Sequence, residues 1–186
     1  MKLYIKFDIN AACKKTLAEQ LEKEQIAYSL VNFCEVELSE TLSGDQLKHL
    51  IANLSNYGIE IIESPKSILV QKIKDAIIEM IYMEEKLPNS TISYFLSEKL
   101  KYSYGYLSNV FVEMTYTSIE NFIIFQKTNR AKELITTNEF TITEIAYRLN
   151  YSSIAHFCNQ FKNETGITPT TFQRIINKRR NSEEVE

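Results

Sequence analysis

Few residues in this 186-residue chain have the types and spacing that catalysis or metal binding requires. The two histidines, His49 and His156, lie far apart, and neither stands in an HExxH motif or near a cysteine pair. The three cysteines form no CxxC pattern, and the four scattered glycines cannot build a phosphate-binding loop, which needs several glycines close together. We therefore expect no enzyme activity, no metal site and no cofactor.

Charged residues are distributed unevenly along the chain. Residues 1–67 hold 7 basic and 10 acidic residues, whereas residues 127–180 hold 9 basic and 4 acidic ones, so the basic charge lies late in the chain. The longest stretch without a charged residue is the 13-residue segment 149–161, which is partly polar and shorter than the ~20 apolar residues that span a bilayer. No signal peptide is recognisable after Met1. We therefore expect a cytoplasmic protein that does not contact a membrane.

The first third of the chain alternates between strand-like and helix-like patterns. Residues 2–8 alternate apolar and polar side chains, which is typical of a half-buried strand, and residues 11–24 place apolar side chains four apart, as on a helix. Ser43 and Gln46 form a capping-box pattern that begins a second helix. Further strands are predicted at 26–33, 35–40 and 59–63. This order predicts an α+β fold, a ferredoxin-like sandwich over residues 1–64.

On the first predicted helix, Cys13 is followed by Leu17 and Leu21 at intervals of four. This spacing resembles that of heavy-metal-associated ferredoxin-like domains, in which a CxxC motif precedes two aliphatic residues, but Asn10 stands at the position of the first cysteine. A single thiolate cannot make the two-coordinate site that Cu(I) favours, so we expect Cys13 to pack at the first turn of the helix. Such sandwiches also serve as ligand sensors and dimerisation modules, and the sequence does not choose between these roles.

Pro65 marks the start of a second domain, residues 65–186, which is all-α by pattern and begins with a helix predicted from Ile68 to Met83. An internal repeat lies within this domain. Leu96, Leu100 and Tyr102 align with Ile145, Leu149 and Tyr151 at an offset of 49, and Leu107, Phe111 and Phe122 align with Phe157, Phe161 and Phe172 at an offset of 50. Each copy has the pattern of a short helix, a turn and a second helix, so the sequence predicts two helix-turn-helix motifs.

The two copies are separated by residues 119–134, which are predicted to form a long helix of about 16 residues, about 24 Å in length. A connector of that length can set two recognition helices about 34 Å apart, which is one turn of DNA. Both recognition helices would then enter successive major grooves on the same face of the duplex.

The second copy carries local signals that fit its predicted helices. Thr141 and Glu144 form a capping-box pattern, Asn150 suits a left-handed turn, and Pro169 begins a helix shortly after Gly166. With these residues, segment 141–172 resembles the signature of the AraC/XylS-type transcription regulators, and the likeness extends over about residues 68–180. The first copy departs from the family pattern, which has two glycines and a proline, at Lys101, Tyr116 and Ile119.

The resemblance implies that the outer faces of the two recognition helices contact DNA. Asn and His side chains can hydrogen-bond base edges, an Ala methyl can contact a thymine methyl, and Ser at a helix N-terminus can help to bind a phosphate. In the first copy the implied residues are Tyr104, Gly105, Tyr106, Ser108 and Asn109. In the second copy they are Ala155, His156 and Asn159, with Ser152, Ser153 and Lys162 placed for phosphates, and Lys127 and Arg130 on the connecting helix.

We therefore expect a sequence-specific DNA-binding transcription regulator that reads two successive major grooves. The expected partners are double-stranded DNA, RNA polymerase and, through the N-terminal domain, a second copy of the chain or an unidentified effector. Residues 103–114 contain no Lys or Arg, which favours an alternative, a protein-interaction adaptor that has lost DNA binding. A further alternative, based on Cys13, is a metal-responsive regulator. The operator and the direction of regulation cannot be read from the sequence.

Overall fold

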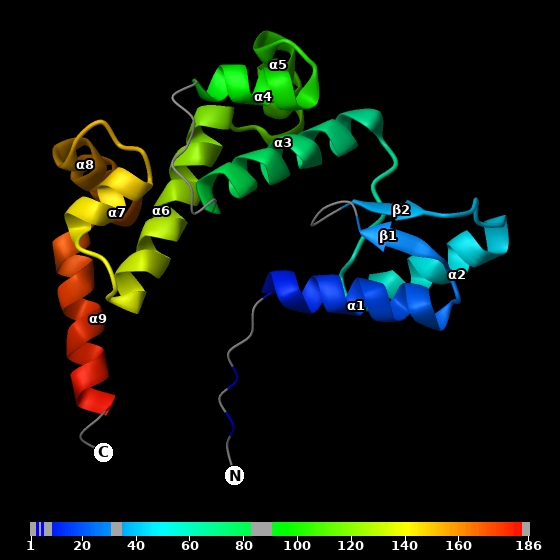
Figure 1. Ribbon diagram of the computed structural model, residues 1–186, viewed down its shortest axis with the longest axis horizontal. Coiled ribbons are helices and arrows are strands. Elements are labelled where there is room, and N and C mark those ends of the chain that lie inside the picture. Colours follow the sequence, from blue (N-terminus) through cyan, green and yellow to red (C-terminus); the bar gives the residue numbers. More distant parts are fainter. Residues whose placement is uncertain (1–2, 4, 6–8, 31–34, 83–90, 184–186) are drawn as a thin grey trace. The chain divides into compact units, whose positions relative to one another are not determined.

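The computed structural model describes residues 3, 5, 9–30, 35–82 and 91–183. The chain divides into two compact units, Met1–Ile68 and Leu69–Glu186 (Figure 1). Within the described ranges, no helix has both the length and the apolar character needed to cross a membrane. The described part of the first unit contains two helices and a hairpin, whereas the second unit is helical throughout its described part.

The N-terminal unit has a small core between its two helices and its hairpin. The elements are α1 Ile9–Lys23, β1 Tyr28–Leu30, β2 Val36–Leu38 and α2 Gly44–Ser55, and the two strands pair antiparallel. The core side chains that are buried are Leu21, Ile26, Leu50 and Leu54. The capping box predicted for the second helix is present: Ser43 Oγ accepts the Gln46 N–H at 3.3 Å, and Gln46 Oε1 accepts the Ser43 N–H at 3.0 Å.

The predicted ferredoxin-like sandwich is wrong, because the described residues form a sheet of only two strands. Residues 59–63, predicted as a strand, belong to no strand, and both isoleucines at 61 and 62 are exposed. The predicted strand at 2–8 lies mainly outside the described residues, but Leu3 and Ile5 are described, and they are 71% and 81% exposed and in no strand. Alternating apolar residues form a strand only where a neighbouring strand and a core surface are available.

Cys13 is exposed on α1, so the prediction that it packs at the first turn of this helix is also wrong. The helix begins at Ile9, and its buried face lies further along the chain: Leu17 packs at the edge of the core and Leu21 is fully buried. The likeness to heavy-metal-associated domains therefore lacks the sandwich fold that it implied.

The C-terminal unit is a helical bundle built on α6, the longest helix among the described residues. Its first helix, α3, spans Pro65–Tyr82 and begins in the last residues of the first unit. The other helices are α4 Ile92–Leu100, α5 Tyr104–Thr115, α6 Ile119–Thr137, α7 Ile142–Arg148, α8 Ile154–Thr165 and α9 Pro169–Glu183. The connector predicted at 119–134 is therefore α6, and it extends three residues beyond the predicted end.

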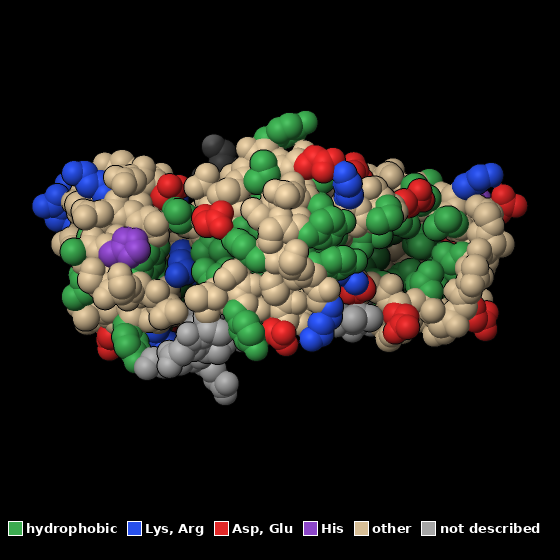
Figure 2. All heavy atoms as spheres, turned by 90° about the horizontal axis from the view of Figure 1, so that it is seen from above, with side chains coloured by type: hydrophobic (Ala, Val, Ile, Leu, Met, Phe, Trp, Pro, Cys, Tyr) green, Lys and Arg blue, Asp and Glu red, His purple; other side chains and the backbone are tan. Residues whose placement is uncertain are grey.

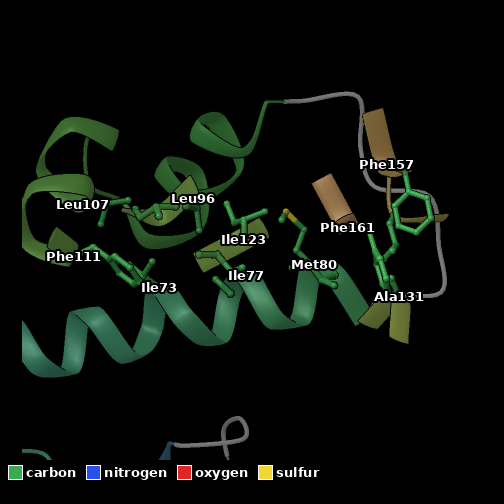
Figure 3. Close-up of a cluster of buried hydrophobic side chains, with 14 of the residues drawn as sticks. Ile73, Ile77, Met80, Leu96, Leu107, Phe111, Ile123, Ala131, Phe157 and Phe161 are labelled. Atoms are coloured by element: carbon green, nitrogen blue, oxygen red, sulfur yellow. The ribbon is translucent and has the colours of Figure 1, made fainter. Parts of the chain in front are cut away.

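One continuous hydrophobic core joins these helices, and α6 contributes to it from both of its halves. In Figure 3, Ile77 of α3 lies close to Leu96 of α4 and to Ile123 in the first half of α6. In the second half of α6, Ala131 lies beside Phe161 of α8 and is fully buried. A small residue at this point allows the aromatic rings of α8 to pack closely against α6. The two halves of the unit are therefore held by one shared helix.

Local backbone chemistry explains where these helices begin and end. A Ser or Thr hydroxyl oxygen precedes each helix from α4 to α9 and accepts the N–H three residues further on: Thr91, Ser103, Ser118, Thr141, Ser153 and Thr168. Residues in the left-handed conformation follow several helices: Lys101, Tyr116, Asn138, Asn150 and Gly166. This conformation costs an ordinary L-residue about 1 kcal/mol, so Lys101 and Tyr116 are strained where glycine would not be.

Candidate nucleic-acid interface

Two helix-turn-helix motifs, α4–α5 and α7–α8, follow the internal repeat of the sequence. Each turn contains a left-handed residue, Lys101 with φ 60° in the first copy and Asn150 with φ 53° in the second. Each second helix is then capped by a serine, Ser103 and Ser153, whose Oγ accepts the N–H three residues on at 3.4 Å and 3.1 Å. Helices α5 and α8 therefore begin at equivalent points, and they hold the position of recognition helices.

The two copies also end alike. In each copy, a threonine just before the left-handed C-cap donates its hydroxyl to the carbonyl four residues back at 2.7 Å: Thr115 and Thr165. A phenylalanine of each recognition helix then contacts one of the next helix, with ring centroids 5.6 Å apart for Phe111 and Phe122 and 5.8 Å apart for Phe161 and Phe172. Helices α6 and α9 are therefore equivalent third helices, and the repeat extends over α4–α6 and α7–α9.

The one-residue difference between the copies lies in the turn. Tyr151 and Ser152 separate the left-handed Asn150 from the capping Ser153, whereas one residue does so in the first copy. The longer turn contacts the imidazole of His156 twice: Ser152 Oγ lies 3.1 Å from His156 Nδ1, and the Tyr151 ring meets it edge-on at 5.4 Å. The turn therefore fixes the direction of an exposed ring at the start of α8.

The outer face of α8 exposes four of the residues predicted to contact DNA: Ala155, His156, Asn159 and Lys162. The side chains of Asn159 and Lys162 have no hydrogen-bond or ion-pair partner among the described residues, so an amide and an ammonium group face outward unpaired. In Figure 2, a histidine and several basic side chains lie on the surface at the left of the view, where Figure 1 shows α7 and α8. This face can offer hydrogen bonds to base edges and a positive charge to a phosphate.

The outer face of α5 is uncharged at the corresponding positions. It exposes Gly105, Tyr106, Asn109 and Val112, whereas Ser108 is half-buried. The Tyr106 ring stacks on that of Tyr102 at a centroid distance of 5.3 Å. This face can therefore offer hydrogen bonds and apolar contacts but, at these positions, no positive charge.

Tyr104 was predicted to face DNA, but its hydroxyl donates to the carboxylate of Glu120 in the first turn of α6. Burial, together with this hydrogen bond, raises the pKa of Tyr104 above its ordinary value. The same bond lowers the pKa of the Glu120 carboxyl. Tyr104 is half-buried, and its polar atom is used to join α5 to α6 rather than to extend the outer face.

The two predicted basic residues of the connecting helix both contact other elements. The Lys127 ammonium lies 4.9 Å from the centre of the Tyr151 ring, and burial lowers the pKa of Lys127. Arg130 binds Glu133 at 2.9 Å and lies over the Tyr82 ring of α3, 4.6 Å from its centre. Tyr82 also donates to Glu133, at 2.9 Å. Lys127 therefore supports the second turn, and Arg130 ties α3 to α6.

Helix α9 carries four exposed basic residues that were not among the predicted DNA contacts: Arg174, Lys178, Arg179 and Arg180. Arg180 donates to the carbonyl of Thr136 near the end of α6, so this part of α9 is held against the connecting helix. The signal in the sequence was the excess of basic residues over 127–180. The excess marks a charged region, but it does not show which helix face bears the charge.

Comparisons with known proteins agree with this arrangement. A protein-family model described as "Helix-turn-helix domain" matches residues 96–175. Among curated proteins, the uncharacterized HTH-type transcriptional regulator YdiP of Escherichia coli (strain K12) is 26% identical over 103 residues, which are 54% of this chain and 34% of YdiP. The matched part of the chain spans about a third of the length of its curated relatives.

Two solved structures have a similar arrangement of helices. The C-terminal domain of AraT, a response regulator from Geobacillus stearothermophilus, is 25% identical, with a TM-score of 0.52, over 60% of this chain and 88% of that one. The DNA-binding domain of AdpA, solved with a target DNA, is 18% identical, with a TM-score of 0.50, over 64% of this chain and 98% of that one, and it is similar in fold. Residues 96–175 therefore form a helix-turn-helix domain. The resemblance of segment 141–172 to the AraC/XylS-type regulators agrees with a helix-turn-helix domain in this part of the chain.

Proposed function

We propose that the chain is a sequence-specific DNA-binding transcription regulator whose recognition helices α5 and α8 enter two successive major grooves. The observation that carries the proposal is that α5 and α8 start and end at equivalent points of two copies joined by one unbroken helix. That helix, α6, has 19 residues and is about 28 Å long, which is close to the turn of DNA, about 34 Å. The fold likeness to AdpA, which was solved with a target DNA, supports duplex DNA as the partner.

In the second copy, one group of exposed side chains contacts bases and another group contacts phosphates. His156 and Asn159 hydrogen-bond base edges, and the methyl of Ala155 contacts a thymine methyl. Phosphates are bound by the turn and by the far end of the helix, through Ser152, Ser153 and Lys162. The support for this division is the exposure of all six residues and the unpaired amide and ammonium of Asn159 and Lys162.

The basic residues of α6 support DNA binding indirectly, without contacting the duplex. The Lys127 ammonium lies 4.9 Å from the centre of the Tyr151 ring, so its proposed role is to support the turn that carries Ser152 and Ser153. Arg130 is engaged by Glu133 and Tyr82, so its proposed role is to keep α3 on the bundle. The exposed basic residues of α9 supply further long-range attraction for DNA.

The N-terminal unit is proposed to receive an effector or to pair two copies of the chain. The core of the C-terminal unit contains no described residue before Leu69, so the N-terminal unit is not needed to complete it and can serve a separate role. RNA polymerase is a proposed partner on the basis of the regulator family alone. The metal-responsive alternative loses the ferredoxin-like sandwich that suggested it, and the single thiolate of Cys13 cannot make the two-coordinate site that Cu(I) favours.

A protein-interaction adaptor remains the second candidate function, because of the outer face of α5. Tyr106 and Val112 are 46% and 43% exposed on that face, and no basic residue lies on α5 to attract a phosphate. Exposed aromatic and aliphatic side chains without a basic neighbour on the same helix are typical of protein contacts. The adaptor would use this face to bind another protein.

Selection of duplex DNA tests the proposed function. The full-length chain is mixed with duplexes that contain about 20 random base pairs, which is about two turns of DNA. We expect enrichment of a common site whose binding weakens with salt. Lys162→Ala should weaken the selected and random duplexes alike, since it removes a phosphate contact, and Asn56→Ala, at an exposed asparagine of the N-terminal unit, is the control. Equal binding of all duplexes, or no binding, would favour the adaptor.

A further inference from the structure

We infer that the first recognition helix reads a base directly, and that it reads the same base as the second. Asn109 and Asn159 each hydrogen-bond an adenine, so the DNA site contains an A·T base pair at two equivalent positions about one turn apart. This inference rests on the proposed function, and it adds to it the base identity that both copies share.

The two asparagines hold the same place in the repeat. Asn109 lies six residues after the capping Ser103, and Asn159 lies six residues after the capping Ser153. Both helices bury the face opposite to these residues in the common core. Both asparagines are exposed, and neither side chain has a hydrogen-bond partner among the described residues. Each helix therefore presents an unpaired amide at the same height and in the same direction relative to its own motif.

An amide group matches one base better than the others. Adenine offers the N7 acceptor and the N6 amino donor on its major-groove edge, and an Asn side chain can bind both at once. An arginine or lysine would be expected for guanine, and the exposed faces of α5 and α8 carry neither at these two positions. The shared asparagine therefore predicts a shared A·T pair.

Small residues one turn before each asparagine give independent support. Gly105 precedes Asn109 by four residues, and Ala155 precedes Asn159 by four. The fold does not require glycine at position 105, since a Cβ there would meet no atom within 4 Å and no left-handed φ is involved. Glycine costs about 1 kcal/mol relative to alanine in a helix interior, and part of that cost applies to Gly105 in the first turn of α5. The fold gives no reason for glycine at position 105. A reason exists if the backbone of α5 must come close to DNA, as a recognition helix does in a major groove.

The two helices differ one turn beyond the asparagines. Lys162 follows Asn159 by three residues, but the equivalent position of the first copy, three residues after Asn109, is Val112. The base contact is therefore shared, while this phosphate contact belongs to the second copy alone. Loss of the first A·T contact should leave the salt dependence of binding unchanged.

A cross between protein and DNA variants tests the inference. The probes are the duplex selected by the full-length protein and two derivatives in which one or the other A·T pair is changed to G·C. On the selected duplex, Asn109→Ala and Asn159→Ala should each weaken binding by about 5- to 150-fold, with no further loss on the duplex that lacks the matching A·T pair. Asn56→Ala, the control, should change nothing. Gly105→Leu should weaken binding although it removes a helix-destabilising glycine, and circular dichroism shows whether this variant is folded.

The outcomes separate this inference from the proposed function. A protein that selects no site overturns both. If a site is selected and Asn159→Ala weakens it but Asn109→Ala does not, the regulator stands and the shared base contact is wrong. A selected site with an A·T pair in only one of the two positions, or full binding by folded Gly105→Leu, also overturns the inference alone.

Discussion

The clearest test of the core packing is Thr128, which lies in the middle of α6 and is only 3% exposed. Its Oγ1 is buried and has no hydrogen-bond partner within the described structure. A buried hydroxyl without a partner costs about 1–3 kcal/mol, and valine has nearly the same shape without the polar atom. Thr128→Val should therefore raise the free energy of unfolding by about 1 kcal/mol, which is a rise in Tm of about 4 °C.

Thr165 provides a matched control, because the same substitution there removes a hydrogen bond that is formed. Its hydroxyl donates to the carbonyl of Phe161 at 2.7 Å, so Thr165→Val should lower the free energy of unfolding by about 1 kcal/mol. Both variants are compared with the parent chain by urea and thermal unfolding. A loss of stability for Thr128→Val similar to that for Thr165→Val would refute the reasoning, since it would show that the Thr128 hydroxyl is satisfied in solution, for example by a buried water.

Three further predictions concern the same unit. Tyr116 is 94% exposed with φ 56°, so Tyr116→Gly should raise the thermal midpoint by relieving left-handed strain, whereas Tyr116→Ala should not. Burial, with a smaller contribution from the charge of Glu164, raises the pKa of Tyr151 from 10.0 to about 12. The stability that this burial of the protonated phenol contributes should be complete below about pH 10 and be lost as the pH rises toward about 12, and Tyr151→Phe should make the fall in the urea midpoint shallower. Finally, the fragment 65–186 should fold alone and bind the site selected by the full chain, because its core is self-contained; an unfolded fragment by circular dichroism would contradict this.

The helical unit could be predicted from the sequence because its signals are local. Ser or Thr at each helix start and apolar residues four apart on the recognition helices lie within short windows, and they indicate a helix without any distant partner. The offset of about 50 residues between two such patterns then indicates the repeat. The exposed faces of α5 and α8 follow from the same periodicity. Asn109, Asn159 and Lys162 are therefore exposed on these faces, and their contact with DNA stays a prediction.

The N-terminal unit could not be predicted in the same way, because a strand requires a partner that is distant in sequence. Residues 59–63 have the composition of a strand but belong to none. The roles of single polar residues also depended on distant partners. The sequence shows that Lys127 and Arg130 are basic, but it does not show that Tyr151 and Glu133 engage them.

Because α6 is one unbroken helix, it limits the spacing of the two DNA half-sites that this protein could bind. A rod that belongs to the cores of both motifs cannot stretch or swivel to follow a change in the distance between two half-sites. One extra base pair between the half-sites displaces the second by about 3.4 Å and rotates it by about 35° around the duplex axis. If both recognition helices bind DNA as proposed, the protein would therefore accept half-sites at only one spacing and one rotation around the duplex, and spacing would restrict its target sites in addition to base identity.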